Sequence, residues 1–307
     1  MARLIGKAKC KGLRMATNPW PRITDLFTHG EAEVALLGVP MSEGSVTPGR
    51  CDLAPETVRA ALQRFSTYDV ETRRELQLRI ADKGDVPVAG LMPADGFAPI
   101  RDAVAASTSA HDLTLLLGGN NAVTRPAAHG LGVPLDKVGL ITLDAHFDLR
   151  DTDEGPRNGN PIRCLLEDGL PGRNICQIGL SPFANTARMH ATADEEGIGV
   201  YTIADVKRRG IASVLDEALA RIGHSEVVMI DFDIDVIDRS QCPGAPGARP
   251  GGMPVDMFFA AARILGGHRK VRLVDLTEFD PSLDVSDITA LTTGRWVCEV
   301  LAGFSWR

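Results

Sequence analysis

Seven short apolar runs constrain the fold of this chain more strongly than any other feature of its sequence. They read EVALLGVP, DLTLLLGG, VGLITLDAH, NICQIGL, GVYTI, EVVMIDFDID and VRLVDLTE. Because they do not alternate polar with apolar residues, they are typical of strands buried on both faces. Amphipathic stretches such as 54–65, 99–107 and 211–222 predict helices between runs. This order predicts an α/β fold, in which a mostly parallel central sheet carries helices on both faces.

Polar side chains gather where four of these strands are expected to end. They lie at 118–121, 144–148 and 233–235, and at Glu278. The carboxyl ends of parallel strands meet at one rim of a sheet, and ligands bind there in such folds. We therefore expect these four segments to form one site.

Two of the segments have the spacing of metal ligands. Asp144, His146 and Asp148 occupy every second position, and Asp233 and Asp235 do the same. On an extended chain such side chains share one face. Four carboxylates in a partly dry site repel one another strongly, and two divalent cations would balance their charge. A helix cap or turn explains one Asp at a strand end, but is a poor explanation for five ligand-type residues at matched spacing.

The types of ligand and the composition narrow the class of protein. Oxygen ligands with little nitrogen and no thiolate favour Mn²⁺, with Ni²⁺ as an alternative. The formal charge of −7 provides no basic field for nucleic acid, and no apolar run reaches the ~18 residues of a membrane span. Six scattered cysteines without a CxxC pair indicate reduced thiols and a cytoplasmic protein. We expect neither nucleic acid nor a membrane as a partner.

The sequence resembles the ureohydrolase superfamily of arginases, agmatinases and formiminoglutamases. The resemblance rests on GVPMSEGSVTPGRCDLAPETVRAAL, LGGNNAVTRP, LDAHFDLRD, NGNPIR, DFDIDVIDRSQCPGAPGARPGG and LTEFDP. It implies a three-layer αβα sandwich, and it covers nearly the whole chain. We therefore expect a single domain over residues 1–307, in which residues 1–30 form a basic arm and lead-in.

The resemblance also implies a reaction and the residues that perform it. Family members bind two Mn²⁺ ions and hydrolyse a C–N bond of a linear amidine or guanidine by attack of a metal-bound hydroxide. By this resemblance Asp144 and Asp233 bridge the ions, His146 and Asp235 complete the shell of one ion, and Asp148 serves the other. Asp148 can also accept a proton from the nucleophile.

The family glutamate that faces the substrate corresponds to Glu278. A carboxylate can accept two parallel N–H bonds from a planar amidinium, which suits this role. The alternative to this substrate-binding role is that Glu278 is an ordinary surface residue or a member of an ion pair. Relatives often form trimers or hexamers, so we expect a homo-oligomer, or a hetero-oligomer with a paralogous subunit.

Three departures from the family pattern fall at the site. Most relatives read Asp-His where this chain has Asn120 and Asn121, and that histidine binds the second ion. An asparagine oxygen is a weaker ligand than imidazole for transition metals. Asn158 stands where many relatives carry a proton-shuttling histidine, and asparagine cannot carry protons near neutral pH. The third departure is Arg239, where many relatives have proline after the aspartate, and Arg249 also stands where many relatives have glutamate.

These departures leave two hypotheses. In the first, the chain is an active hydrolase of a formiminoglutamate-, guanidino- or biguanide-type substrate, with Asn121 as a weak ligand and a second ion that is weakly held or missing. In the second, it is a catalytically silent subunit that supports an active paralogue, as in heteromeric ureohydrolases. We favour the first, because a site freed from metal has no electrostatic reason to keep four clustered acids. A metal-dependent sensor ranks last, since no output domain is evident.

Overall fold

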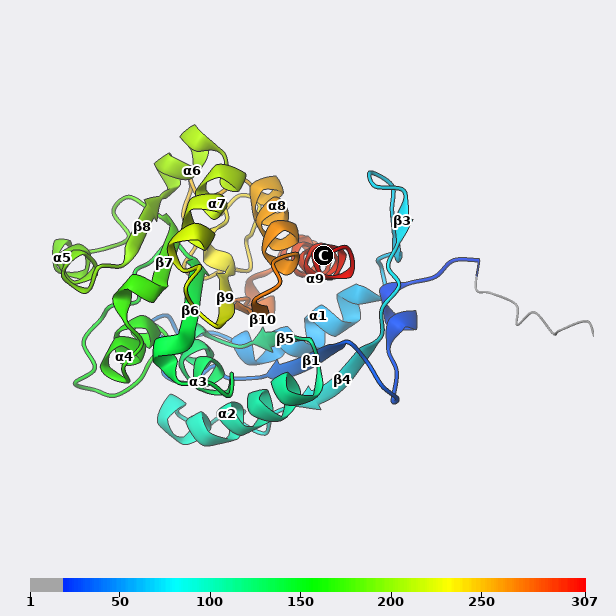
Figure 1. Ribbon diagram of the computed structural model, residues 1–307, viewed down its shortest axis with the longest axis horizontal. Coiled ribbons are helices and arrows are strands. Elements are labelled where there is room, and N and C mark those ends of the chain that lie inside the picture. Colours follow the sequence, from blue (N-terminus) through cyan, green and yellow to red (C-terminus); the bar gives the residue numbers. More distant parts are fainter. Residues whose placement is uncertain (1–18) are drawn as a thin grey trace, which may run out of the picture.

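The computed structural model describes residues 19–307, which contain one central sheet of eight parallel strands. The strands are β1 (Val34–Val39), β4 (Ile80–Asp85), β5 (Leu113–Gly118), β6 (Val138–Leu143), β7 (Ile175–Leu180), β8 (Gly199–Thr202), β9 (Val227–Asp233) and β10 (Val271–Thr277). Their order across the sheet is β4-β1-β5-β10-β9-β6-β7-β8 (Figure 1). All seven apolar runs form strands, and the predicted α/β fold with a parallel central sheet is confirmed.

None of the seven apolar runs corresponds to β4, which lies at one edge of the sheet. Its residues read IADKGD, and only the first two are buried. An edge strand has one side without a neighbour and therefore needs no continuous apolar run. A small antiparallel hairpin of β2 (Tyr68–Asp69) and β3 (Arg74–Glu75) also escaped prediction and projects from the body of the molecule (Figure 1).

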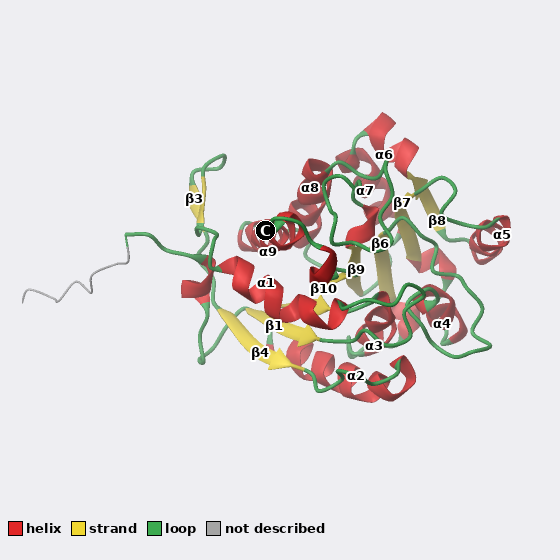
Figure 2. Cartoon of the chain, turned by 180° about the vertical axis from the view of Figure 1, so that it is seen from behind, coloured by secondary structure: helices red, strands yellow, loops and turns green. Residues whose placement is uncertain are grey.

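Helices cover both faces of the sheet (Figures 1 and 2). One face carries α1 (Ala54–Leu62), α6 (Ile203–Arg209), α7 (Ile211–Arg221), α8 (Val255–Gly266) and α9 (Ile288–Ser305). The other face carries α2 (Pro93–Ala110), α3 (Thr124–His129), α4 (Pro161–Glu167) and α5 (Ala187–Glu196). The helix predicted over 99–107 is longer at both ends. It begins at Pro93, because a proline in the first turn loses no helical hydrogen bond.

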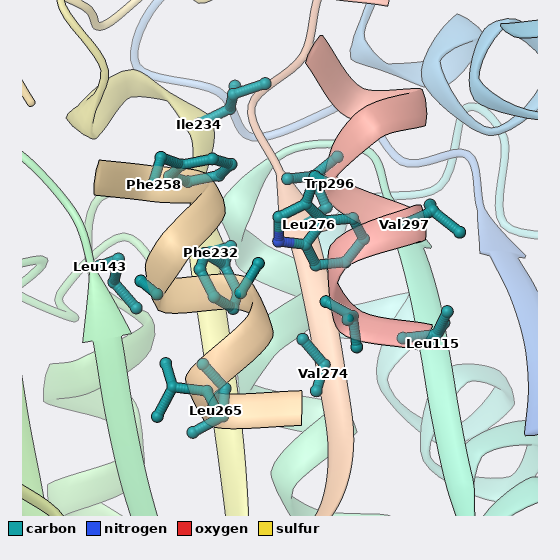
Figure 3. Packing of buried hydrophobic residues seen from close by; sticks show 14 of the residues in the cluster. Leu115, Leu143, Phe232, Ile234, Phe258, Leu265, Val274, Leu276, Trp296 and Val297 are labelled. Atoms are coloured by element: carbon teal, nitrogen blue, oxygen red, sulfur yellow. The ribbon is translucent and has the colours of Figure 1, made fainter. Parts of the chain in front are cut away.

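The core on the α8–α9 face is built around three aromatic rings (Figure 3). The ring of Phe232 on β9 lies 5.1 Å from that of Phe258 and 5.5 Å from that of Trp296, in edge-on contacts. All three side chains are fully buried. Truncating such a side chain to alanine typically costs about 3–5 kcal/mol. This packing fixes β9, which ends at the predicted metal ligand Asp233 and leads into the 3₁₀ helix that carries Asp235.

Two expectations concern the N-terminal segment of the chain and its relation to a membrane. Of the basic arm and lead-in predicted at residues 1–30, residues 1–18 lie outside the described part of the chain. The remainder includes a short 3₁₀ helix at Ile23–Leu26. Between residues 19 and 307, no helix combines the length and the apolar character that crossing a membrane requires.

Candidate metal centre

The four polar segments lie at one rim because their strands are neighbours. The strands β5, β10, β9 and β6 are adjacent in this order and run in the same direction. Glu278 and Asp144 directly follow β10 and β6, Asp233 is the last residue of β9, and Asn121 lies three residues after the end of β5. These residues are all buried. The fold therefore brings together side chains that are far apart in the sequence.

Asp144, His146 and Asp235 form the tightest group of candidate ligands. Their ligand atoms all lie within 4.8 Å of one another. The Nδ1 atom of His146 lies 3.0 Å from Oδ2 of Asp235 and 3.4 Å from Oδ1 of Asp144. Backbone amides also aim the carboxylates, since His146 N donates to Asp144 at 2.6 Å and Ala145 N to Asp235 at 3.3 Å.

The charges in this group are those expected around a cation. Asp235, and then Asp144, raise the pKa of His146 to about 12 against the effect of burial. Burial, with Asp235 nearby, raises the pKa of Asp144 to about 6. Burial also tends to raise the pKa of Asp235, but the imidazolium of His146 outweighs burial and lowers this pKa. A proton on His146 thus offsets the negative charge of Asp144 and Asp235, as a bound divalent cation would. Carboxylate and imidazole ligands together suit such a cation.

Asp233 and Asp148 extend the group toward β5. Asp233 caps the 3₁₀ helix at Ile234–Val236 by accepting a bond from Asp235 N at 2.9 Å. Burial, followed by repulsion from neighbouring acids, raises the pKa of both Asp233 and Asp148 well above the usual range. Asp148 has a φ of 52°, in the left-handed region that non-glycine residues rarely adopt. Such strain persists where the surroundings impose it, often at functional sites.

Asn121 presents its amide nitrogen to Asp148. It begins the 3₁₀ helix at Asn121–Val123, and its Nδ2 donates to Oδ2 of Asp148 at 2.6 Å. Its carbonyl oxygen accepts hydroxyl bonds from Thr124 at 2.8 Å and Thr277 at 3.1 Å. The oxygen that was expected to bind a cation is therefore engaged by two hydroxyl groups. The neighbouring Asn120 donates away from the centre, to Glu43 O and Ser45 Oγ at 2.8 Å each.

Glu278 is positioned by two donors on the same oxygen. Its Oε1 accepts from Asn121 N at 2.7 Å and from Asn158 Nδ2 at 3.0 Å. The amide of Asn158 is itself oriented, because its oxygen accepts from Val46 N at 2.8 Å. Burial raises the pKa of Glu278 to about 7 despite both bonds. Its φ of 62° is also left-handed. Asn158 thus holds Glu278, whereas the sequence comparison suggested only that it lacks a proton-shuttling group.

A second pair of acids lies below the centre, on the same strands. Asp231 and Asp275 face each other in register on β9 and β10, and both are fully buried. Burial, followed by Asp275, raises the pKa of Asp231 well above the usual range, and burial raises that of Asp275 to about 7. Within residues 19–307 neither oxygen of Asp231 has a hydrogen-bond donor.

A pocket opens above the candidate ligands. It is lined by the buried side chains of Asp148, Asp233, Asp235 and Glu278 and by the partly exposed side chains of His146 and Asn158. Other lining residues were not identified from the sequence, namely Val46, Arg150, Asn185, Met189 and Pro246.

Of these, Asn185 fixes the segment that carries His146. It accepts from Phe147 N at 2.8 Å and donates to Ala145 O at 2.9 Å. Thr124, Thr277 and Asn185 carried no sequence signal, because each acts through a contact between distant segments.

Comparisons with known proteins show which family the chain is similar to. The Arginase family model matches residues 32–303. The chain is 33% identical to a formimidoylglutamase of Halalkalibacterium halodurans over 274 residues, which cover 87% of this chain and 86% of the relative. It is 30% identical to a guanidinopropionase of Pseudomonas aeruginosa over 292 residues, covering 90% and 88%.

A solved structure has the same fold. It is Trypanosoma cruzi formiminoglutamase with Mn²⁺₂, at a TM-score of 0.87 and 22% identity, covering 94% of this chain and 99% of that one.

Proposed function

The chain belongs to the arginase family and is a metal-dependent hydrolase of amidine or guanidine compounds, and we propose that its substrate is an amidine that carries a carboxylate, foremost formimidoylglutamate. The formimidoylglutamase and guanidinopropionase relatives support this class, since both names denote substrates with an acidic group. The observation that carries the proposal is the cluster of Asp144, His146 and Asp235, two of which line one pocket together with Glu278.

Two divalent cations fit this donor set, with Mn²⁺ the proposed metal. Asp144, His146, Asp233 and Asp235 would hold one ion, and Asp148 would serve the second together with the bridging acids. The T. cruzi neighbour with Mn²⁺₂ supports manganese. When bound, such cations make a water molecule acidic enough to act as a nucleophile near neutral pH. The ion beside Asn121 is proposed to be the weaker of the two.

The remaining residues bind the amidine and handle protons. Glu278 faces the planar amidinium, and a carboxylate can accept two of its N–H groups. Asn158 keeps Glu278 in place. Asp148 receives the proton of the attacking water on the oxygen that Asn121 does not occupy. Water adds to the amidine carbon, the C–N bond to the amino acid breaks, and the departing nitrogen leaves protonated as an amine.

Steady-state kinetics on a substrate panel test the proposal. The purified chain, loaded with Mn²⁺, should hydrolyse formimidoylglutamate with the highest kcat/KM among formimidoylglutamate, guanidinopropionate, agmatine, arginine and a biguanide. Glu278→Gln should retain its metal and lose most of this activity, because the charge-assisted contact is weakened. A higher kcat/KM on agmatine or arginine than on either acid would contradict an acidic substrate.

The alternative of a catalytically silent subunit finds no support in these relatives, and the same preparation distinguishes it. If the chain alone is inert but a mixture with a paralogue is active, Asp144 and Asp233 of this chain should be mutated and the mixture assayed again. Unchanged activity would establish the silent role, and lost activity with an intact assembly would place the chemistry in this chain. The proposed homo-oligomer, a trimer or hexamer, is tested by light scattering on the purified chain.

A further inference from the structure

The loop at residues 238–252 stands beside a candidate metal ligand. It follows the 3₁₀ helix that carries Asp235 and leads into α8. It also lines the pocket with Pro246, Gly247 and Arg249. The course of this β9–α8 loop therefore determines what lies against Asp235.

Within the β9–α8 loop, Gly247 packs directly on the carboxylate of Asp235. A Cβ atom added at Gly247 would lie 2.9 Å from Cγ of Asp235 and closer still to its Oδ2. This Oδ2 is also the oxygen that lies 3.0 Å from Nδ1 of His146, while Oδ1 accepts from Ala145 N at 3.3 Å. The backbone of Gly247 thus occupies space into which the carboxylate would otherwise turn.

Arg239 sets the course of the loop around Gly247. Its Nη1 donates to Ala245 O at 2.7 Å and to Pro246 O at 3.1 Å, and its backbone N donates to Arg249 O at 3.1 Å. Hydrogen bonds from a guanidinium are charge-assisted and stronger than those between neutral groups. Because the accepting carbonyl groups flank Gly247 on both sides, Arg239 governs where this glycine lies.

The earlier part of the loop is anchored without Arg239. Gly244 N donates to Oγ1 of Thr289 in α9 at 2.8 Å, and Gly244 O accepts from Asp280 N at 2.8 Å. Loss of the Arg239 side chain should therefore release residues 245–249 and leave the rest of the fold in place.

We propose that Arg239 is a positioning residue of the metal centre, which holds Gly247 against Asp235 and thereby keeps this carboxylate directed at the cation. The inference rests on the proposed function, because it takes Asp235 as a ligand of a divalent cation. Arg239 itself does not line the pocket and acts only through the loop. Its loss should therefore weaken cation binding although every ligand is still present.

Calorimetric titration of Mn²⁺ into metal-free protein provides the first test. Arg239→Met should weaken binding of the tighter ion about 10- to 100-fold, the typical cost of losing a contact that orients a ligand. Arg239→Lys should recover part of this affinity, because its ammonium group can still donate to a carbonyl oxygen. With Mn²⁺ in large excess, most of the wild-type kcat should return to Arg239→Met, since mass action restores occupancy.

Arg272→Met is the matched control. Nη2 of Arg272 also donates to two backbone carbonyl groups, Thr108 O at 2.8 Å and His111 O at 2.9 Å, but near the amino end of β10. The control should keep its Mn²⁺ affinity even where urea unfolding shows reduced stability. Equal losses of Mn²⁺ affinity in both variants would indicate general destabilisation and overturn the proposal. If Arg239→Met does not fold, Arg239→Lys carries the same comparison.

Gly247→Ala tests whether Arg239 acts through this glycine. The added Cβ would displace the carboxylate of Asp235, so this substitution alone should weaken Mn²⁺ binding. In an Arg239→Met background the loop can move away, and the same substitution should cost about 3-fold less affinity or better, because residues coupled through one contact are non-additive. Fully additive losses would overturn the assignment.

The Mn²⁺ titration also separates this inference from the proposed function. An inactive wild-type chain that binds Mn²⁺ more tightly than Arg239→Met would contradict the proposed function and support the inference. An active chain with equal Mn²⁺ affinity in wild type and Arg239→Met would overturn the inference alone. A wild-type chain that binds no Mn²⁺ would overturn both.

Discussion

At the scale of single residues, Asn121 shows what a sequence can and cannot predict. By the family resemblance, we expect an amide at this position where a histidine ligand is usual. The sequence does not reveal which end of the amide faces the site, because that depends on Thr124 in α3 and Thr277 in β10. These hydroxyl groups occupy the oxygen, so the nitrogen faces Asp148. Asn121 thus holds the carboxylate of Asp148.

We expect Asn121→His to strengthen the second metal site. Imidazole is a better ligand than an amide for transition metals, and improving one ligand typically changes affinity about 10- to 100-fold. The measurement is Mn²⁺ content after dialysis against limiting metal, together with calorimetric titration. Asn121→Ala, which removes the amide without adding a ligand, is the control. Equal metal content in all three proteins would mean that position 121 does not face the second ion.

Asn158→Ala tests whether this residue positions Glu278. The substitution removes the donor to Oε1 of Glu278 and leaves Val46 N without its acceptor. We expect kcat/KM to fall about 10- to 100-fold with unchanged metal content, as is typical when a supporting contact is lost. Steady-state kinetics and metal analysis on the same preparation check this. A variant with wild-type kinetics would show that Asn121 N alone suffices to hold Glu278.

At the scale of elements, the strands with continuous apolar runs were predictable and the edge was not. Strands β5, β6, β7, β9 and β10 are buried on both sides, so their sequences carry the signal along nearly their whole length. Strand β4 is half exposed and reads as a polar loop. The start of α2 was missed because Pro99, a usual helix breaker, lies inside it. Local patterns thus located the interior of the sheet and misjudged its margins.

The buried acids on β9 and β10, Asp231 and Asp275, are expected to lower the free energy of unfolding by an amount that can be measured. The buried Asp231 and Asp275 both have raised pKa values, with Asp275 at about 7, against about 3.9 in an unfolded chain. The folded state binds protons more readily than the unfolded state, so stability is present at low pH and falls as pH rises through these values. We expect Asp231→Asn to stabilise the protein by roughly 1–3 kcal/mol at pH 8 and less at pH 5.

Urea unfolding at both pH values checks this expectation. Asp238→Asn is the matched control, because Asp238 follows the same strand but is partly exposed and accepts from Ser240 and Gly251. Destabilisation by Asp231→Asn at pH 8 would mean that a charged Asp231 contributes favourably, against the burial argument.

At the scale of the whole molecule, metal removal should weaken the fold most strongly in alkaline solution. Without cations, Asp144 and Glu278 have pKa values of about 6 and 7, so stability is lost as the pH rises from about 4 to about 7 and both acids ionise. Bound cations favour the ionised acids. We expect Mn²⁺ at 100 times its dissociation constant to stabilise the protein by about 2.7 kcal/mol, with higher affinity at pH 8 than at pH 6.

Thermal unfolding of chelated and Mn²⁺-loaded protein at both pH values provides the measurement. Mg²⁺ at the same concentration is the control, because it prefers octahedral oxygen shells and keeps its water. Identical midpoints with and without Mn²⁺ at pH 8 would show that the acids do not bind the ion in the folded state.

The position of β10 also has a consequence for biosynthesis. Although it is the last strand of the chain, β10 lies in the middle of the sheet, between β5 and β9. Until residues 271–277 leave the ribosome, a nascent chain can build only two partial sheets, β4-β1-β5 and β9-β6-β7-β8, each with an open edge. Open edges of this kind pair readily with other chains, and contacts between distant segments form slowly. The strand that precedes Glu278 is therefore also the one that ends this exposure, so the nascent polypeptide closes its sheet and completes the candidate site in the same late step.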